Sequence, residues 1–143
     1  MNVIEAKAFK YLTEKMGYLE NDIKFQPNAS PDFVTSDNRG YEIKTCIGNN
    51  IYFHKSQFEL LKKLNNIDIL VFRKNEEMPI SIFPTNIISE NCVVDGIKIK
   101  VSKGNCRKDM KLEKGRLLKY DNYRKTKENL LYIRKTGDCR SCR

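Results

Sequence analysis

Features that would place this chain in a membrane or in an oxidising compartment are missing from its sequence. No apolar run approaches the length of a membrane-spanning helix, and charged residues interrupt the N-terminal segment, so no secretory signal peptide is visible. The cysteines number five, and an odd count without a secretory signal argues against a framework of disulfides. We therefore expect a soluble, cytoplasmic protein with reduced thiols.

Histidine, internal repeats and low-complexity segments are also scarce or missing. His54 is the only histidine, and it falls between a predicted strand and a predicted helix. We favour a neutral histidine at that junction over a general base. Because no extended low-complexity segment is present, we expect the C-terminal part to fold partly onto the core rather than to stay disordered.

Positive charge is concentrated in the last third of the chain. The 143 residues, of which 40% are hydrophobic, suit a single domain with one core. Residues 1–97 hold 11 basic and 13 acidic side chains, net −2, whereas residues 98–143 hold 16 and 5, net +11. This asymmetry fits a nearly neutral catalytic body and a C-terminal segment that holds a polyanion. A well-solvated basic surface explains the charge alone equally well.

Aromatic residues are interleaved with the basic residues of this last third. Tyr120, Tyr123 and Tyr132 lie among its lysines and arginines. The mixture suits a groove that follows a nucleic-acid backbone through phosphate contacts. No helix-turn-helix or similar reader of base sequence is evident. The residues that we expect to contact DNA here are Arg107, Lys108, Arg124 and Lys125.

The order of apolar and turn-forming residues predicts an α/β chain. Apolar side chains recur at helical spacing in two segments, and they alternate or run continuously in several shorter ones. Ser56 with Glu59 three positions later suggests a capping box for the second helix. The expected elements are helices at 3–16 and 55–65, strands at 22–26, 32–36, 40–47, 67–72 and 79–84, a turn before 51–53, a hairpin within 92–101 and a short strand at 130–133.

The predicted hairpin over residues 32–47 brings chemistry-bearing side chains together. Alternate side chains of a strand share a face, so Glu42 and Lys44 point the same way. A tight turn between the two strands folds Asp32 back beside them. Two carboxylates can hold Mg²⁺ or Mn²⁺, with the backbone carbonyl of Ile43 as a third ligand. Lys44 would then orient or deprotonate the attacking water, or neutralise charge that develops at the phosphorus.

Three further residues are candidates for the same site. Glu5 is a candidate metal ligand if the first helix overlooks the hairpin, although the helix dipole alone favours a glutamate in the first turn. Lys55 and Gln57 are candidates to contact a phosphate or the attacking water, because they stand at the start of the second helix. The competing interpretation is an ordinary solvated helix start.

In this order, the motifs resemble those of the PD-(D/E)xK nuclease superfamily. Asp32, Glu42 and Lys44 match its motif residue by residue, and Glu5 matches the glutamate that many members carry on their first helix. The resemblance implies a restriction-endonuclease-like αβββαβ core with a mixed central sheet flanked by helices. It also implies a metal-dependent endonuclease that hydrolyses phosphodiester bonds of DNA.

Within the superfamily, the stretch after Lys44 is similar to archaeal Holliday-junction resolvases, which have a comparable strand, helix and strand. Ser30 then takes the place of the resolvase serine near the scissile phosphate. The chain departs from that group in lacking a glycine- and serine-rich stretch before Asp32 and in its long C-terminal part. The substrate therefore stays open between a junction and the duplex, flap or single strand of a restriction or repair nuclease. A homodimer would suit junction or duplex cleavage, by analogy alone.

The resemblance also divides the chain. Residues 1–87 are expected to form the nuclease core. Residues 88–143 are expected to form a basic extension with short strands, packed on or beside the core rather than folded independently. A non-catalytic nucleic-acid-binding module that keeps the same fold is the remaining alternative.

Four cysteines offer thiolates for a structural zinc ion. Cys139 and Cys142 form a CxxC pair, and Cys92 and Cys106 would complete a tetrahedral set. One CxxC pair with two single cysteines is a weaker pattern than two pairs, and free thiols are the competing interpretation. A zinc-stapled binding module would use this set.

Overall fold

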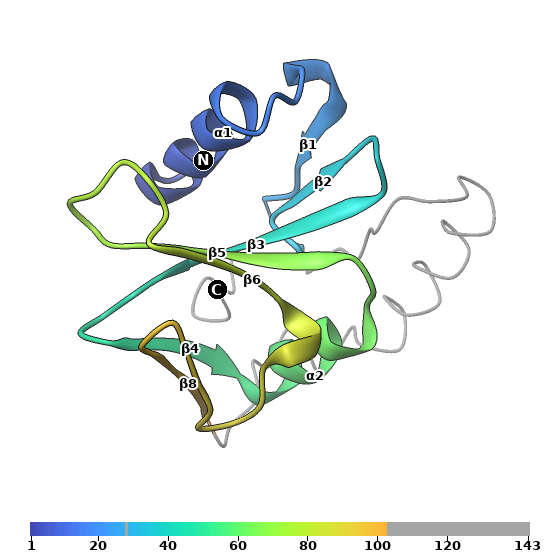
Figure 1. The fold of residues 1–143 in the computed structure, drawn as a ribbon. Helices are drawn as coiled ribbons and strands as arrows, with labels where there is room; N and C mark the ends of the chain where they lie inside the picture. The colour runs from blue at the N-terminus through green and yellow to red at the C-terminus, as the bar shows by residue number, and fades with distance from the viewer. Residues whose placement is uncertain (28, 103–143) are drawn as a thin grey trace.

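A computed structural model describes residues 1–27 and 29–102 of the chain. Figure 1 shows their arrangement, with helix α1 on one side of a central sheet and helix α2 with a smaller sheet on the other. The strand expected at 130–133 and the remainder of the extension after residue 102 lie outside the described residues. The described part confirms the α/β class, since it combines two helices with two mixed sheets.

Helix α1, Val3–Glu14, begins at a capping box that the sequence analysis did not single out. The side chain of Asn2 accepts a hydrogen bond from the Glu5 backbone N–H at 2.7 Å, and the Glu5 carboxylate accepts one from the Asn2 N–H at 2.9 Å. Ala8 and Leu12 form its buried stripe. The helix ends shortly before Gly17, whose φ of 84° is the left-handed conformation that glycine adopts most easily.

The central sheet has five strands in the order β1-β2-β3-β5-β6. Neighbours pair antiparallel except for β3 and β5, which are parallel and joined through β4 and α2. The predicted hairpin is therefore present as β2 and β3, with Phe33 opposite Tyr41. The strands are β1, Ile23–Phe25; β2, Phe33–Thr35; β3, Arg39–Thr45; β5, Ile67–Phe72; and β6, Ser81–Pro84.

A second sheet of three strands lies below the first in Figure 1 and was not predicted as a sheet. β4, Asn50–His54, pairs in parallel with β8, Ile97–Ser102, and β8 pairs with β7, Val93–Val94. The predicted hairpin is confirmed, with its turn at Asp95 and Gly96, whose φ values are 51° and 78°. Part of the expected extension thus contributes two strands to a sheet that also contains β4.

Helix α2, Lys55–Lys63, follows β4 without a loop, and its predicted capping box is wrong. His54 holds the N-cap position without a side-chain cap. Ser56 lies inside the first turn, and its buried hydroxyl makes no hydrogen bond within the described part of the chain. Two short 3₁₀ turns complete the described part, Glu20–Asp22 and Thr85–Ile87. Neither helix seen here is long and apolar enough to cross a membrane.

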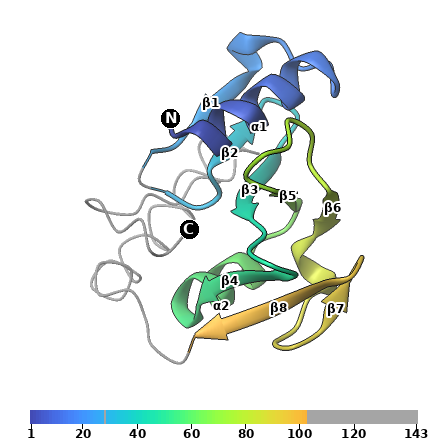
Figure 2. The same ribbon diagram turned by 90° about the vertical axis from the view of Figure 1, so that its left-hand side faces the viewer.

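Two apolar cores lie on the two faces of the central sheet, and Figure 2 shows the layers one above the other, with α1 at the top and α2 and the second sheet at the bottom. The core under α1 comprises Ala8, Leu12, Phe33, Tyr41, Ile43, Leu70 and Phe72. On the other face, Val34, Ile69 and Val71 pack with α2 and the second sheet, including Ile51, Phe53, Leu61 and Ile99. Alternate residues of β2 and β5 therefore serve opposite cores, as strand geometry requires.

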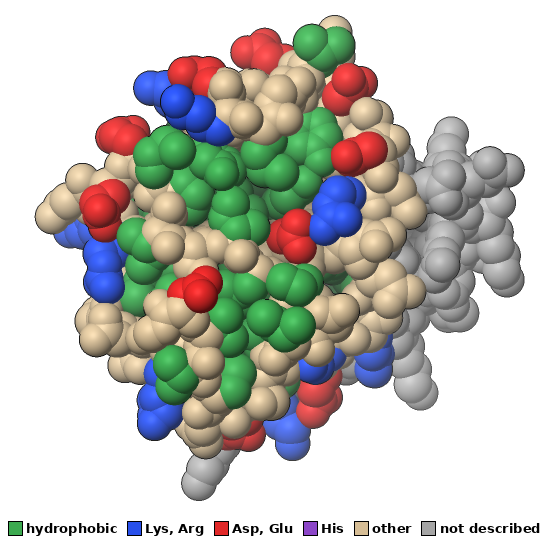
Figure 3. All heavy atoms as spheres, viewed as in Figure 1, with side chains coloured by type: hydrophobic (Ala, Val, Ile, Leu, Met, Phe, Trp, Pro, Cys, Tyr) green, Lys and Arg blue, Asp and Glu red, His purple; other side chains and the backbone are tan. Residues whose placement is uncertain are grey.

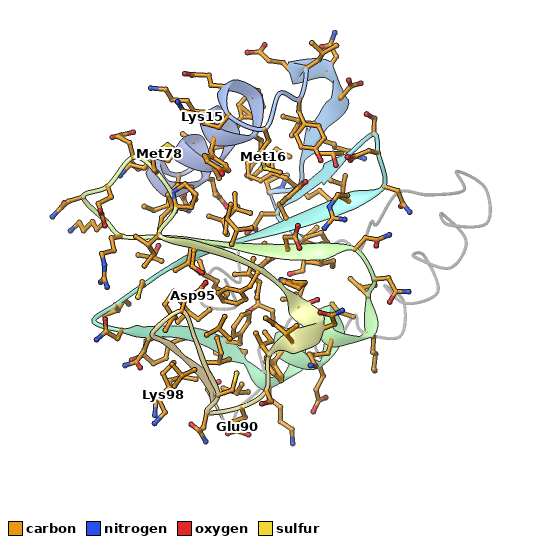
Figure 4. All side chains as sticks on the ribbon, in the orientation of Figure 1. Lys15, Met16, Met78, Glu90, Asp95 and Lys98 are labelled. Carbon is orange, nitrogen blue, oxygen red and sulfur yellow. The ribbon has the colours of Figure 1, made fainter. Side chains whose placement is uncertain are left out.

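Polar contacts and surface side chains complete this layering. The Ser81 hydroxyl of β6 donates to the carboxylate of Asp95, which Figure 4 shows between the central sheet and the β7–β8 hairpin. This contact ties the two sheets together at one edge. In the same orientation, Figure 3 shows apolar side chains gathered on the surface between α1 and β6.

Candidate active site

Asp32, Glu42 and Lys44 lie on one face of the β2–β3 hairpin. Phe33 pairs with Tyr41, so continuing the register places Asp32 opposite Glu42. Glu42 and Lys44 alternate with Tyr41 and Ile43, which belong to the core under α1. Asp32, Glu42 and Lys44 are 1%, 0% and 2% exposed, respectively. The charged face that the sequence predicts is therefore buried, between the central sheet and the layer that contains α2.

The backbone of Ile43 lies beside the Asp32 carboxylate. The Ile43 N–H donates to Asp32 Oδ2 at 2.9 Å. The N–H of Gly40 donates to the carbonyl of Asn66, just before β5, and the N–H of Cys46 donates to the carbonyl of Phe72 in β5, at 2.8 Å each. The backbone N–H groups of even-numbered residues in this stretch therefore point toward β5, and those of odd-numbered residues point away from it. Because N–H and C=O of one strand residue point to the same side, the Ile43 carbonyl also points to the side of Asp32. That is the carbonyl proposed from sequence as a metal ligand.

Gln57 joins the other two members of the cluster. From the first turn of α2, its Nε2 donates to Glu42 Oε2 at 3.1 Å and its Oε1 accepts from Lys44 Nζ at 3.0 Å. The amide thus presents its donor to the carboxylate and its acceptor to the ammonium. Lys44 Nζ also donates to the Tyr52 carbonyl at 2.8 Å and lies 4.3 Å from the centre of the Phe53 ring. β4 and α2 together therefore position the lysine.

Oε1 of Glu42 and Oγ of Ser30 are buried oxygen atoms with no hydrogen-bond partner among the described residues. A buried acceptor without a donor costs free energy, and more so when it is charged. A divalent cation would compensate Glu42 Oε1, because hard cations prefer carboxylate oxygens. Ser30 lies two residues before Asp32, fully buried, as part of the loop that leads into β2.

Glu5 reaches the neighbourhood of the cluster from the opposite side of the sheet. It is 4% exposed and takes part in the capping box of α1. With Ile43 and Lys44 it lines a cleft of about 380 Å³. No group of three histidine, cysteine, aspartate or glutamate residues within 1–27 and 29–102 could hold a metal ion. Glu5 thus lines the same cleft as Lys44, and its role as a further metal ligand stays a prediction.

The remaining predicted residues are divided by the structure. Gln57 is buried in the cluster, whereas Lys55, at the start of the same helix, is exposed. The ring of His54 contacts the Ser102 hydroxyl at 3.3 Å, on the far end of β4. Cys92 is half-buried, and its sulfur accepts a hydrogen bond from the Ser89 N–H. The residues that lie outside the described part are Arg107, Lys108, Arg124, Lys125, Cys106, Cys139 and Cys142.

A hydroxyl network occupies the edge of the opposite core. Tyr18 donates to Asp37 Oδ2 at 2.8 Å, so the 2.6 Å contact between Tyr18 and Tyr41 has Tyr41 as the donor. Burial is the main cause that raises the pKa of Tyr41, and its hydrogen bond to Tyr18 adds to the effect. Burial also raises the pKa of Tyr18. Both groups stay protonated at neutral pH and hold α1's C-terminal side to the hairpin.

Sequence reasoning missed the part that β4 plays in the site. Tyr52 supplies a backbone carbonyl to Lys44, and Phe53 supplies a ring face. A backbone carbonyl has no signature in sequence. The adjacent aromatic residues Tyr52 and Phe53 can be read in the sequence, but only the fold shows that β4 passes beside Lys44.

The described residues define an α/β protein with a buried Asp-Glu-Lys cluster that is bridged by a glutamine. Comparisons with protein families, curated proteins and solved structures give no match to this chain. Its function must therefore be inferred from the chemistry of the cluster and from the strands and helices that hold it.

Proposed function

We propose that this protein is a metal-dependent DNA endonuclease of the PD-(D/E)xK type. The observation that carries the proposal is the meeting of Asp32, Glu42 and Lys44 on one buried face, with Gln57 joining the last two. Burial of an ion cluster is costly, and its net charge of −1 would be compensated by a divalent cation. A role in catalysis or metal binding explains such a cluster better than a contribution to the stability of the fold does.

The topology supports a restriction-endonuclease-like core. Helix α1, the antiparallel strands β1, β2 and β3, helix α2 and the parallel strand β5 follow one another in the αβββαβ order. The central sheet is mixed and lies between the two helices. β4 is an addition to this order, because it leaves the central sheet and joins the second one.

The residues of the cluster fit a magnesium or manganese ion. Asp32 and Glu42 would supply carboxylates, and Ile43 would supply the backbone carbonyl that points to the side of Asp32. When bound, such an ion activates a water molecule and stabilises charge on the phosphate. Lys44 would bring a positive charge to the same phosphate or to the attacking water. Gln57 would hold the side chains of Lys44 and Glu42 in fixed positions through its two hydrogen bonds.

The structure of the DNA that is cut is a separate question within the proposal. A Holliday-junction resolvase and a restriction or repair nuclease on duplex, flap or single-stranded DNA are both compatible with the cluster. The basic residues 98–143, net +11, would bind the phosphate backbone in either case. A homodimer would be expected if two strands are cut symmetrically.

A cleavage assay tests the proposed function. Purified full-length protein would be incubated with labelled four-way junction, linear duplex, flap and single-stranded DNA, in Mg²⁺, Mn²⁺ or EDTA. We expect metal-dependent cleavage of at least one substrate and none in EDTA. Glu42→Gln and Lys44→Ala should each lower the rate at least about 100-fold. The matched controls Glu59→Gln and Lys63→Ala, both exposed on α2, should cut like the wild type.

Two outcomes would contradict parts of this proposal. Equal cutting of junction and linear duplex would refute the resolvase assignment but not the nuclease. DNA binding without cleavage of any substrate, in either metal, would favour the non-catalytic binding module instead. An unchanged rate for Lys44→Ala would show that the measured cleavage comes from a contaminant or from another site.

A further inference from the structure

The cleft beside the cluster has a wall of aromatic and apolar side chains. Its volume of about 380 Å³ lies in the range of small-ligand sites. Lys44 and Glu5 are its charged lining residues among those described. The apolar part of its lining includes Ile4, Phe25, Pro27, Ile47 and Tyr52, together with Met1 and Ile43.

Tyr52 links this wall directly to Lys44. Along β4, Ile51 and Phe53 are buried in the core, so Tyr52 between them faces outward and is 49% exposed. Its backbone carbonyl accepts the hydrogen bond from Lys44 Nζ at 2.8 Å. Tyr52 therefore does two things: its ring borders the cleft, and its backbone carbonyl positions the Lys44 ammonium that would face a phosphate.

We propose that this cleft binds an unpaired base of single-stranded DNA, next to the phosphate that Lys44 would contact. The inference rests on the proposed nuclease function and names its substrate class. Aromatic side chains bind single strands by stacking with bases, and the positive charge beside them contacts the backbone. Tyr52 and Phe25 provide the aromatic surface, and Lys44 provides the charge.

The same geometry favours an unpaired nucleotide over a base within a duplex. In a duplex each base is stacked between its neighbours, and its faces cannot meet a protein ring unless the nucleotide is extruded. An unpaired base exposes both faces and enters a cleft of this size without that cost. A single strand, a flap or the frayed end of a duplex would supply it.

A fluorescence experiment tests the inference apart from cleavage. A single-stranded oligonucleotide with one 2-aminopurine would be titrated with the full-length protein in EDTA, with the same sequence as a duplex for comparison. We expect quenching of the single strand by the wild type and little change for the duplex. Tyr52→Phe should keep the quenching, because stacking needs only the ring. Tyr52→Ala should lose it and bind the single strand about tenfold more weakly.

Control variants keep the result interpretable. Ile87→Ala removes a side chain that is 54% exposed and does not line the cleft, so it should bind like the wild type. Circular dichroism would establish that Tyr52→Ala is folded. Equal quenching by wild type and Tyr52→Ala, or stronger quenching of the duplex than of the single strand, would overturn the inference.

Cleavage separates failure of this inference from failure of the proposed function. One outcome is that the wild type cuts DNA with metal, yet cuts an intact single strand and one with an abasic nucleotide beside the scissile phosphate at the same rate. In that case the proposed nuclease function stands and the proposed base site is wrong. If quenching depends on Tyr52 but no metal gives cleavage, the base site stands and the nuclease is wrong.

Discussion

The two faces of the β2–β3 hairpin are buried to the same degree but differ completely in chemistry. Toward α1 the hairpin presents Phe33, Tyr41 and Ile43, none more than 5% exposed. Toward α2 it presents Asp32, Glu42 and Lys44, none more than 2% exposed. The first face gains free energy from removing apolar surface from water. The second face loses hydration of three ions and regains only part of it through hydrogen bonds.

The apolar face of the β2–β3 hairpin is explained by stability, whereas the charged face is not. Evolution toward stability alone would fill both faces with apolar side chains, since replacing a buried ion cluster by well-packed apolar residues is often neutral or stabilising. Stability alone therefore does not account for the charged face, and this supports the proposed function. Gln57 hydrogen-bonds to both Glu42 and Lys44 and so fixes their relative positions.

The largest expected effect comes from breaking the apolar face. Phe33→Ala removes a fully buried ring from the core under α1 and should lower the free energy of unfolding by about 3–5 kcal/mol. Urea unfolding would measure it. The conservative Phe33→Leu should cost less than about half as much. A loss below about 1 kcal/mol for the alanine variant would show that this core contributes little.

Metal binding sharpens the contrast on the charged face. In Mg²⁺ at 100 times its dissociation constant, the wild type should gain about 2.7 kcal/mol over its stability in EDTA. Glu42→Gln should gain almost nothing, because the ligand charge is removed while the carboxamide oxygen can still accept from Gln57. Urea unfolding with and without metal would show this, with Glu59→Gln as control. The same gain in wild type and Glu42→Gln would place the ion elsewhere.

Tyr41 contributes a hydrogen-bonding hydroxyl to the apolar face. Tyr41→Phe removes the hydroxyl that donates to Tyr18 and should cost about 1.5 kcal/mol at pH 7. The folded state raises the pKa of Tyr41 above its ordinary 10.0. Its contribution is therefore complete below pH 10 and is lost as the pH rises further, since the unfolded chain releases the proton first.

The pH profile of unfolding distinguishes this effect from simple loss of packing. The wild type should lose stability more steeply above pH 10 than Tyr41→Phe does. Part of the alkaline loss should remain in the variant, because burial also raises the pKa of Tyr18. Parallel profiles for the two proteins would contradict a raised pKa at Tyr41.

The smallest predicted effect concerns the helix end that faces the cleft. Asn2→Ala removes the side chain that caps α1 and should cost about 1 kcal/mol. Asn2→Gly should cost only a few tenths. Thermal unfolding would compare the two. Cleavage by folded Asn2→Ala should change much less than cleavage by Glu42→Gln, because Asn2 does not belong to the charged cluster.

Local sequence patterns were sufficient for much of the fold. The strand expected at 67–72 is observed with those bounds, because its continuous apolar run serves two cores at once. The hairpin that pairs β2 with β3 was predictable from its turn residues and from alternation. Asp32 and Glu42 come together for that reason, since two strands joined by a short turn have few registers available.

Contacts distant in sequence could not be predicted in the same way. Alternation identified the strand of residues 97–101, but not its parallel pairing with β4, in which each residue pairs with one 48 positions away in the chain. Gln57 was expected at the site, but its hydrogen bonds to Glu42 and Lys44, which lie 15 and 13 positions away in the chain, were not predicted. The Ser56 cap failed because β4 continues into α2 and leaves no residue free to turn back.

The hydrogen bond from the Ile43 amide to Asp32 Oδ2 turns one backbone proton into a spectroscopic reporter. The chemical shift of an amide depends on the electron density of its acceptor, so protonation of Asp32 or withdrawal of its charge by a cation would move the Ile43 resonance. Nuclear magnetic resonance could then follow the state of the carboxylate residue by residue in the native protein, without a substitution, a substrate or a dye.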